Sequence, residues 1–207
     1  MTTEYVEKLY NRYSSFYDLI WGKVFHSGRE KIPDLLPFEK DDHVLEVGIG
    51  TGLSIPFVPT HVRLTGIDLS QNMLDEAAKR LHGMRRKNVE LIKMDATNLD
   101  FPDNTFDHVL AAYFISTVPD PVRVVEEIKR VCKPGGVIVF LNHFQSDNRW
   151  IAAFDRLISP LTYRLGFYFD LNLPRLLKAT NLVVESKEKI DPLAIWKAIR
   201  IINTKPS

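Results

Sequence analysis

Three glycines separated by single residues follow directly after a short apolar run at positions 43–47. The glycines are Gly48, Gly50 and Gly52. Glycine allows a tight backbone turn and lets the backbone approach a ligand that a side chain would keep away. An ordinary loop turn can also contain glycines at this spacing, so the glycines alone leave both interpretations open.

Two aspartates strengthen the ligand-binding interpretation, because each stands at the end of a predicted strand. Asp68 ends the second strand, 18 residues after Gly50, where a carboxylate can accept hydrogen bonds from both hydroxyls of a ribose. Asp95 ends the third strand, where it can bind an adenine amino group. A dinucleotide site would carry a glycine three positions after Gly50, but this chain has Leu53 there. The pattern therefore favours a nucleoside ligand without a pyrophosphate.

The elements that must position these residues alternate between short apolar strands and helices. Strands are expected at 43–47, 62–67, 89–94, 106–112 and 137–142, with a final pair around 182–190 and 195–202. Helices are expected at 5–21, 53–58, 71–82 (capped by Ser70), 121–132 and 150–169, and a further helix leads to Pro37. The turn 133–136 is assigned a structural role. This alternation predicts an α/β fold of the Rossmann-like type, doubly wound around a mostly parallel seven-stranded sheet.

The 207 residues are expected to form a single domain with three parts. Residues 1–40 would be a helical lid that can contact a membrane, because the first helix is amphipathic and rich in aromatic residues. Residues 41–144 would be the cofactor-binding core. Residues 145–207 would hold a substrate-side insertion and the final strands. We expect the protein to be a monomer.

The composition argues against several classes of protein. A net charge of +1 does not fit a protein that binds duplex nucleic acid. The single cysteine, Cys132, cannot form an internal disulfide, and the first residues do not resemble a secretory signal, so we expect a cytoplasmic protein. The six histidines are scattered, which predicts no metal site. No run approaches the roughly 20 apolar residues that span a bilayer, so any membrane contact is expected to be peripheral.

Residues 45–144 resemble the class I S-adenosylmethionine-dependent methyltransferases. The resemblance is carried by the sequence Glu46-Val47-Gly48-Ile49-Gly50-Thr51-Gly52, by Asp68, and by Met94-Asp95-Ala96. It implies S-adenosyl-L-methionine as the cofactor and S-adenosyl-L-homocysteine as its product. The implied cofactor-binding residues are Glu46, Gly48, Gly50, Thr51, Gly52, Asp68, Leu69, Met73, Asp95 and Ala96.

The resemblance also implies a role for each of these positions. The glycine turn would pass under the methionine part of the cofactor, with Glu46 supporting the turn. Asp68 would bind the ribose, and Asp95 with Ala96 would bind the adenine. Leu69 and Met73 would flank the adenosine by packing.

The whole chain resembles the short bacterial phospholipid N-methyltransferases. Besides the glycine turn, the matching segments are Tyr10-Asn11-Arg12-Tyr13 with Tyr17-Asp18, Val24-Phe25-His26-Ser27-Gly28-Arg29, Val118-Pro119-Asp120-Pro121 and Asn142-His143-Phe144. The resemblance implies stepwise N-methylation of phosphatidylethanolamine and its mono- and dimethyl derivatives to phosphatidylcholine. Quinone and sterol methyltransferases share several of these segments.

Two other functions therefore stay open. One is a C- or O-methyltransferase that acts on a quinone precursor or another small apolar molecule. The other is a non-catalytic cofactor-binding or membrane-adaptor protein, which the intact Glu46, glycines, Asp68 and Asp95 argue against.

The chemistry of amine methylation predicts what a substrate site must contain. An alkylamine has a pKa of about 10 and is mostly protonated at neutral pH, so the site must favour the neutral amine. His143, just after the fifth strand, is our candidate to accept the proton or contact the headgroup, and Asn142 could orient the amine. The alternative for His143 is a ring satisfied by backbone groups at a strand end.

Aromatic residues are expected around a methylated ammonium, because aromatic faces attract cations without competing for protons. Tyr13 and Tyr17 from the first helix, and Tyr113 at the end of the fourth strand, are predicted to bind the substrate together with Asn142 and His143. Among these five, His143, Tyr17 and Tyr113 are predicted to be catalytic. Core packing is the alternative for each tyrosine.

A lipid substrate would require contact with a membrane surface. A helix rich in tyrosine and tryptophan suits that interface. After Gln145 the chain carries ten Lys or Arg residues and six Asp or Glu residues, an excess that anionic lipid can attract, although a solvated surface is the alternative. We therefore expect a cytoplasmic protein, peripherally associated with the inner face of the cell membrane and without a nucleic-acid partner.

Overall fold

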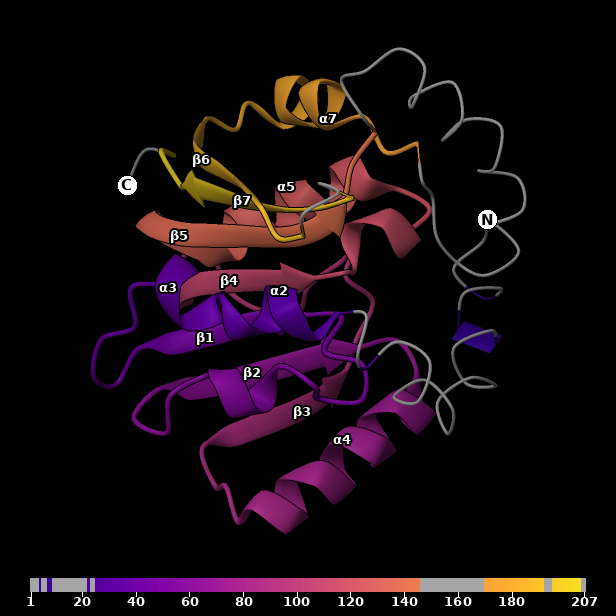
Figure 1. The fold of residues 1–207 in the computed structure, drawn as a ribbon, viewed down its shortest axis with the longest axis vertical. Coiled ribbons are helices and arrows are strands. Elements are labelled where there is room, and N and C mark those ends of the chain that lie inside the picture. The colour runs from indigo at the N-terminus through magenta and orange to yellow at the C-terminus, as the bar shows by residue number, and fades with distance from the viewer. Residues whose placement is uncertain are drawn as a thin grey trace.

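The structure is a computed structural model that describes residues Glu4, Glu7, Lys8, Gly22, 25–145, 170–191 and 195–205. Its centre is one seven-stranded sheet with the strand order β3-β2-β1-β4-β5-β7-β6 (Figure 1). The strands are β1 His43–Val47, β2 Arg63–Asp68, β3 Val89–Lys93, β4 Phe106–Ala112, β5 Cys132–His143, β6 Val184–Lys189 and β7 Trp196–Ile202. β7 is antiparallel to both of its neighbours, and the other neighbouring pairs are parallel. The expected Rossmann-like, mostly parallel sheet is confirmed.

Helices cover both faces of the sheet, as a parallel sheet with two apolar faces requires. The described helices are α2 His26–Glu30, α3 Ile32–Leu35, α4 Gln71–Met84, α5 Pro121–Val131 and α7 Leu173–Thr180, with 3-10 turns η1 Ile55–Phe57 and η2 Ile115–Thr117. One buried cluster joins the sheet to α5 and α7, and the other joins it to α3, α4 and Phe25, the residue before α2.

Side-chain caps begin the three longest described helices. Ser70 accepts a hydrogen bond from the Met73 backbone N–H at the start of α4, as the sequence predicts. Asp120 and Asn172 cap α5 and α7 in the same way, and each of these two helices has a proline in its first turn. Such caps satisfy backbone donors that a helix leaves unpaired at its N-terminus.

Apart from shifts of one or two residues at element ends, the structure differs from the sequence-based expectations in the following places. The expected helix 53–58 is only the 3-10 turn Ile55–Phe57, because Pro56 has no N–H to continue a helix. The strand β5 begins at Cys132 rather than at Val137, so it includes the expected turn 133–136. Backbone hydrogen bonds of Gly135 and Gly136 with Asn203 hold these residues in the strand. Finally, α7 and η2 were not predicted from the sequence.

The carboxyl ends of β1 to β4 lie together at one edge of the sheet (Figure 1). This is where the chain order reverses between β1 and β4, the usual place for a ligand in an open α/β sheet. The expected helices 5–21 and 150–169 lie almost entirely outside the described residues. Within the described part of the chain, no helix is long and apolar enough to cross a membrane.

Candidate cofactor and substrate site

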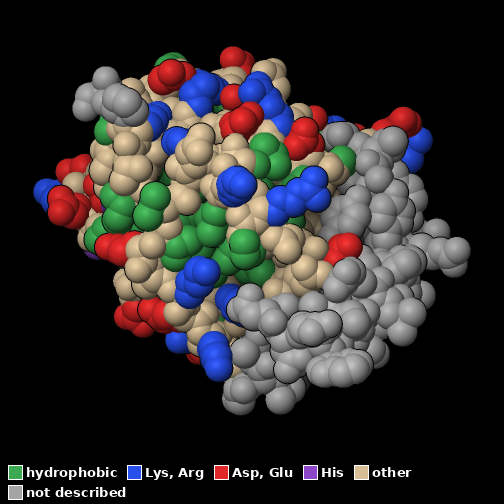
Figure 2. All heavy atoms as spheres, turned by 90° about the horizontal axis from the view of Figure 1, so that it is seen from above, with side chains coloured by type: hydrophobic (Ala, Val, Ile, Leu, Met, Phe, Trp, Pro, Cys, Tyr) green, Lys and Arg blue, Asp and Glu red, His purple; other side chains and the backbone are tan. Residues whose placement is uncertain are grey.

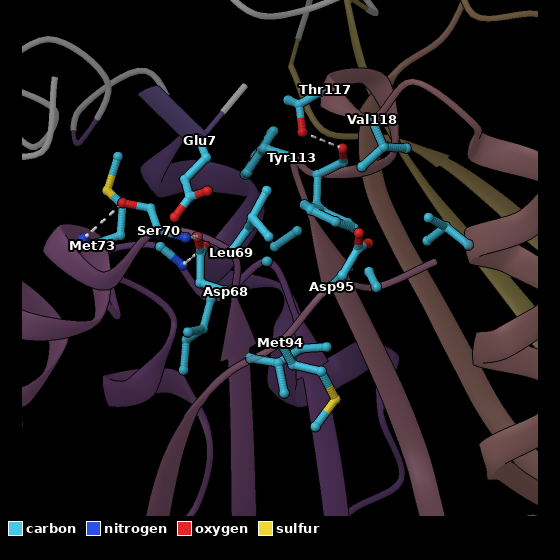
Figure 3. A pocket seen from close by; sticks show the side chains of 18 of the residues that line it. Glu7, Asp68, Leu69, Ser70, Met73, Met94, Asp95, Tyr113, Thr117 and Val118 are labelled. Atoms are coloured by element: carbon cyan, nitrogen blue, oxygen red, sulfur yellow. Dashed lines mark hydrogen bonds between the residues drawn. The ribbon is translucent and has the colours of Figure 1, made fainter. Parts of the chain in front are cut away.

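A pocket lies at the carboxyl ends of the parallel strands, with about 890 Å³ of space free of protein atoms, part of which is open solvent. Figure 3 shows that the labelled side chains line it from opposite sides. The lining includes Glu7, Arg29, residues 48–51, 67–70, 94–97, 112–114 and 117–119, Met73 and Val124. The glycine turn, Asp68 and Asp95 are therefore brought to one cavity.

The three glycines of the turn serve two different purposes. All three have a positive φ, between +56° and +77°. A Cβ on Gly48 would overlap the ring of Phe114, and one on Gly52 would lie 2.6 Å from the Ile55 side chain. No described atom lies within 4 Å of the position that a Cβ on Gly50 would take, although Gly50 lines the pocket. Gly48 and Gly52 permit close packing, whereas Gly50 leaves space for a ligand.

Asp68 connects the glycine turn to the start of α4. Its Oδ2 accepts a hydrogen bond from the Gly50 N–H at 2.9 Å, and its Oδ1 accepts one from the Ser70 N–H at 2.9 Å. Desolvation raises the pKa of Asp68 to about 6, against the opposing effect of these N–H donors. The carboxylate thus holds the turn in place and also faces the pocket, as the ribose prediction requires (Figure 3).

Asp95 lies across the cavity from Met73. Its Oδ1 accepts hydrogen bonds from the Thr97 N–H at 2.9 Å and the Thr97 hydroxyl at 2.8 Å. These two bonds fix the carboxyl group while the residue lines the pocket, as Ala96, Leu69 and Met73 also do (Figure 3). The adenine and adenosine contacts remain predictions that this arrangement supports.

Glu46 is buried beside the glycine turn and does not belong to the described pocket lining. The Ser54 hydroxyl lies 2.6 and 2.5 Å from its two carboxylate oxygens. Burial raises the pKa of Glu46 to about 7, while the Ser54 hydroxyl and the charge of Arg29 act in the opposite direction. Its support of the glycine turn stays a prediction. Gly52 also lies outside the described pocket lining.

Tyr113 lines the pocket at the end of β4 in a left-handed conformation with φ +60°. Its ring stacks on Phe25 with centroids 4.1 Å apart, and the edge of Trp196 approaches both rings. A non-glycine residue at positive φ is strained, and such strain is often found at functional sites. Tyr13 and Tyr17 lie outside the described residues, so their convergence with Tyr113 stays a prediction.

Asn142 and His143 are buried at the end of β5 and are not part of the described pocket lining. Asn142 accepts a hydrogen bond from the Ser116 hydroxyl and donates one to the backbone carbonyl of His143. The Nδ1 of His143 is 2.8 Å from the carbonyl oxygen of Ile195. Because a carbonyl only accepts, this Nδ1 carries a proton. Both side chains contact protein groups, and their substrate roles remain predictions.

The sequence interpretation missed Arg29, Glu7 and Phe114 as residues of the pocket. Arg29 belongs to a segment that carries the family resemblance, but nothing in the sequence indicates that it is buried beside the glycine turn. Glu7 reaches the cavity from the N-terminal segment and accepts a hydrogen bond from Lys93 at 2.7 Å. Only the folded arrangement brings these residues together.

The pocket fits S-adenosylmethionine in three respects. Gly50 opens space at the turn, the Asp68 carboxylate faces the cavity, and the Asp95 carboxyl group is held at the neighbouring strand end. These groups suit a ligand that combines an adenosine with an amino acid. Within the described residues, no cluster of side chains could hold a metal ion.

Comparison with known proteins agrees with this fit. A family model described as a methyltransferase domain matches residues 45–140. The chain is 38% identical over 201 residues to phosphatidylethanolamine N-methyltransferase of Cereibacter sphaeroides, covering 97% of this chain and 98% of that enzyme. It is 33% identical over 150 residues to demethylmenaquinone methyltransferase of Listeria welshimeri, covering 69% of this chain and 64% of that enzyme.

A solved structure shares the fold. Phosphoethanolamine N-methyltransferase 2 of Haemonchus contortus, in complex with S-adenosyl-L-methionine, superposes with a TM-score of 0.75 and 18% identity, covering 95% of this chain and 57% of that one. The fold, the pocket and the family model define an S-adenosylmethionine-dependent methyltransferase. Within this class, the chain belongs to the family of the C. sphaeroides enzyme.

Proposed function

We propose that the protein N-methylates phosphatidylethanolamine and its mono- and dimethyl derivatives towards phosphatidylcholine. The observation that carries this proposal is the match to phosphatidylethanolamine N-methyltransferase over 97% of this chain and 98% of that enzyme. A match that extends beyond the core includes the parts that differ most between methyltransferases of different substrates.

The cofactor supplies an electrophilic methyl group on a positively charged sulfur. The residues of this chain must bring the neutral amine to it, although only about one amine in a thousand is neutral at pH 7, a handicap of about 4 kcal/mol. Enclosure in the pocket lowers the pKa of an amine. We assign Tyr113 to contact the substrate, since its ring lines the pocket.

We assign His143 as the proton acceptor. With Nδ1 protonated, a neutral His143 ring carries its lone pair on Nε2. Because His143 is not part of the described pocket lining, the proton would reach it through an intervening water or side chain. Asn142, Tyr13 and Tyr17 would complete the substrate site, with Tyr17 joining Tyr113 and His143 as a catalytic residue.

We further propose a peripheral contact with anionic membrane on the inner face of the cell membrane, by a cytoplasmic monomer. Residues 1–40 would act as a lid and membrane contact, residues 41–144 as the cofactor core, and residues 145–207 as the substrate side. The Glu7–Lys93 contact joins the first part to β3 beside the pocket. Arg175 and Lys178 of α7 are exposed, and Figure 2, which views the molecule from the α7 side, shows basic side chains around an apolar area.

The test uses purified protein, radiolabelled-methyl S-adenosylmethionine and vesicles of phosphatidylethanolamine mixed with an anionic lipid. We expect label in mono-, di- and trimethylated lipid after separation. Vesicles without phosphatidylethanolamine are the control. Clear cofactor binding without label in any of these lipids would reject the proposed substrate.

A second candidate function is methylation of a quinone precursor. It is favoured by the 33% identity to demethylmenaquinone methyltransferase, although that match covers 150 residues only. Transfer of the label to a carbon or a phenolic oxygen, and not to the amine, would identify this function.

A further inference from the structure

Arg29 is a buried cation beside the cofactor pocket. The side chain is 6% exposed and lines the same cavity as Gly48, Gly50 and Tyr113. Within the described part of the chain, its Nε and Nη1 atoms are buried and have no hydrogen-bond partner. No described carboxylate forms an ion pair with it.

A buried guanidinium with two unpaired nitrogens is costly. Arginine stays protonated in proteins, so burial cannot be relieved by loss of its charge. Buried polar groups are nearly always hydrogen-bonded, and a buried charge is usually paired. The two nitrogens of Arg29 therefore lack acceptors that a ligand in the pocket can provide.

Two aromatic rings hold this guanidinium in position. The Arg29 Cζ lies 5.1 Å from the ring centroid of Tyr113 and 5.8 Å from that of Phe25. A Cβ on Gly28 would overlap the Tyr113 hydroxyl, so a glycine is needed for the ring to lie against α2. Contact with aromatic faces orients an arginine without using its N–H donors.

The nearby acidic side chains are engaged elsewhere. The Glu46 carboxylate accepts from the Ser54 hydroxyl, and Arg29 affects Glu46 through its charge alone, which lowers the Glu46 pKa. Glu7, which also lines the pocket, accepts a hydrogen bond from Lys93. Asp68 accepts from the backbone N–H groups of Gly50 and Ser70.

We propose that Arg29 is the anion-binding residue of this pocket and donates charge-assisted hydrogen bonds to a carboxylate or phosphate group of a bound ligand. Two ligands carry such a group. One is the cofactor, through its methionine carboxylate, and the other is the phospholipid, through its phosphodiester. The second case rests on the proposed function, whereas the first depends only on cofactor binding.

The test compares two nucleosides by calorimetry without lipid. S-adenosylhomocysteine carries the carboxylate, and S-adenosyl-3-thiopropylamine is the same molecule without it. If the carboxylate is the anion, Arg29→Met should weaken S-adenosylhomocysteine binding about tenfold or more and leave the second nucleoside nearly unchanged. Arg29→Lys, which keeps the charge, should recover part of the loss.

The matched control is Arg86→Met. Arg86 is a partly buried arginine that donates to the backbone carbonyls of Ile55, Val58 and Pro59, away from the pocket lining. Its loss should lower the melting temperature without changing the ratio of the two nucleoside affinities. This comparison separates an anion-binding role from a general effect of removing a buried arginine.

A phosphate ligand would give a different result. Arg29→Met would then leave both nucleoside affinities unchanged and raise the KM for phosphatidylethanolamine in mixed micelles about tenfold or more. Equal weakening of both nucleosides, or no change in nucleoside affinity and in KM, would overturn the proposal. Another outcome is that the wild-type protein shows no lipid methylation while Arg29→Met still weakens S-adenosylhomocysteine binding more than binding of the second nucleoside. In that case the proposed function fails and this inference stands.

Discussion

At the scale of single residues, Asp68 performs two tasks with one carboxyl group. It accepts the N–H groups of Gly50 and Ser70, and it lines the pocket where a ribose is expected. Both tasks require the ionised form, which offers acceptors only. Because the pKa of Asp68 is raised to about 6, we expect cofactor binding to be sensitive to mild acid.

We predict that S-adenosylhomocysteine binds more weakly as the pH falls through about 6. Protonation of Asp68 removes an acceptor for the ribose hydroxyls and for the N–H groups of the turn. Asp68→Asn should weaken binding at pH 8 about tenfold or more and should lose much of the pH dependence between 5 and 7. Calorimetry across this range checks both effects, and an unchanged affinity of the variant would argue against ribose binding by Asp68.

Glu46 gives a second pH prediction, on stability. Burial raises its pKa from 4.5 to about 7 in the folded protein, so the folded state binds more protons than the unfolded state between these values. The free energy of unfolding should therefore fall as the pH rises from about 4.5 to 7, by about 3 kcal/mol for this group alone. Asp68 acts in the same direction between 3.8 and about 6.

Glu46→Gln should flatten that pH dependence, because the amide does not ionise and its oxygen can still accept from Ser54. Urea unfolding of the ligand-free protein at several pH values measures the slope. Parallel profiles for the wild type and the variant would show that Glu46 is ionised throughout.

At the scale of elements, the sequence predicted most of the sheet and less of the substrate side. The strands β1 to β4 are short apolar runs with clear ends, and β4 has the predicted bounds 106–112. The helix α7 was missed although Asn172, Pro174 and its leucines have the pattern of a capped amphipathic helix. The signal was present, but it lay directly after a segment with loose periodicity.

The candidate site shows the same division. Gly48, Gly50, Asp68 and Asp95 could be predicted because each stands next to a strand end, and strand ends meet at one edge. Arg29 could not, because its burial against Tyr113 depends on how α2 packs on the sheet. For His143 the sequence left two alternatives open, and the contact of its Nδ1 with the Ile195 carbonyl fits the one in which backbone groups satisfy the ring.

The glycine turn allows a prediction at the scale of this element. Gly50 and Gly135 both have a positive φ, and at neither position would an added methyl group have a described atom within 4 Å. Gly50→Ala and Gly135→Ala should each cost about 1–2 kcal/mol of unfolding free energy, from backbone strain alone. Only Gly50 lines the pocket, so only Gly50→Ala should weaken S-adenosylhomocysteine binding.

Urea unfolding and calorimetry on both variants provide the comparison. Equal affinities of the two variants for S-adenosylhomocysteine would mean that the space beside Gly50 is not used by the ligand. Gly48→Ala should be less stable than either variant, because its methyl group would overlap the Phe114 ring.

At the scale of the whole molecule, we expect cofactor binding and lipid access to depend on different parts of the chain. Residues of β1 to β4 and the turns after them supply most of the described pocket. These strands share two buried clusters, whose first described residues are Leu45 and Phe25. Among the described residues before Phe25, Glu7 contacts the rest of the protein: it lines the pocket and accepts a hydrogen bond from Lys93. We expect the sheet to fold without the N-terminal segment, whereas access of a lipid should depend on this segment strongly.

Deletion of residues 2–20 tests this separation. We expect the melting temperature to change by only a few degrees, because the sheet and its helices share two buried clusters of their own, and we expect methyl transfer to lipid in vesicles to fall to background. The matched control is Glu7→Gln, which removes one partly exposed ion pair with Lys93 and should change stability by less than about 1 kcal/mol. Full activity of the deletion variant on vesicles would remove the proposed lid and membrane contact. Loss of the cooperative unfolding transition would instead assign the segment to the folding core.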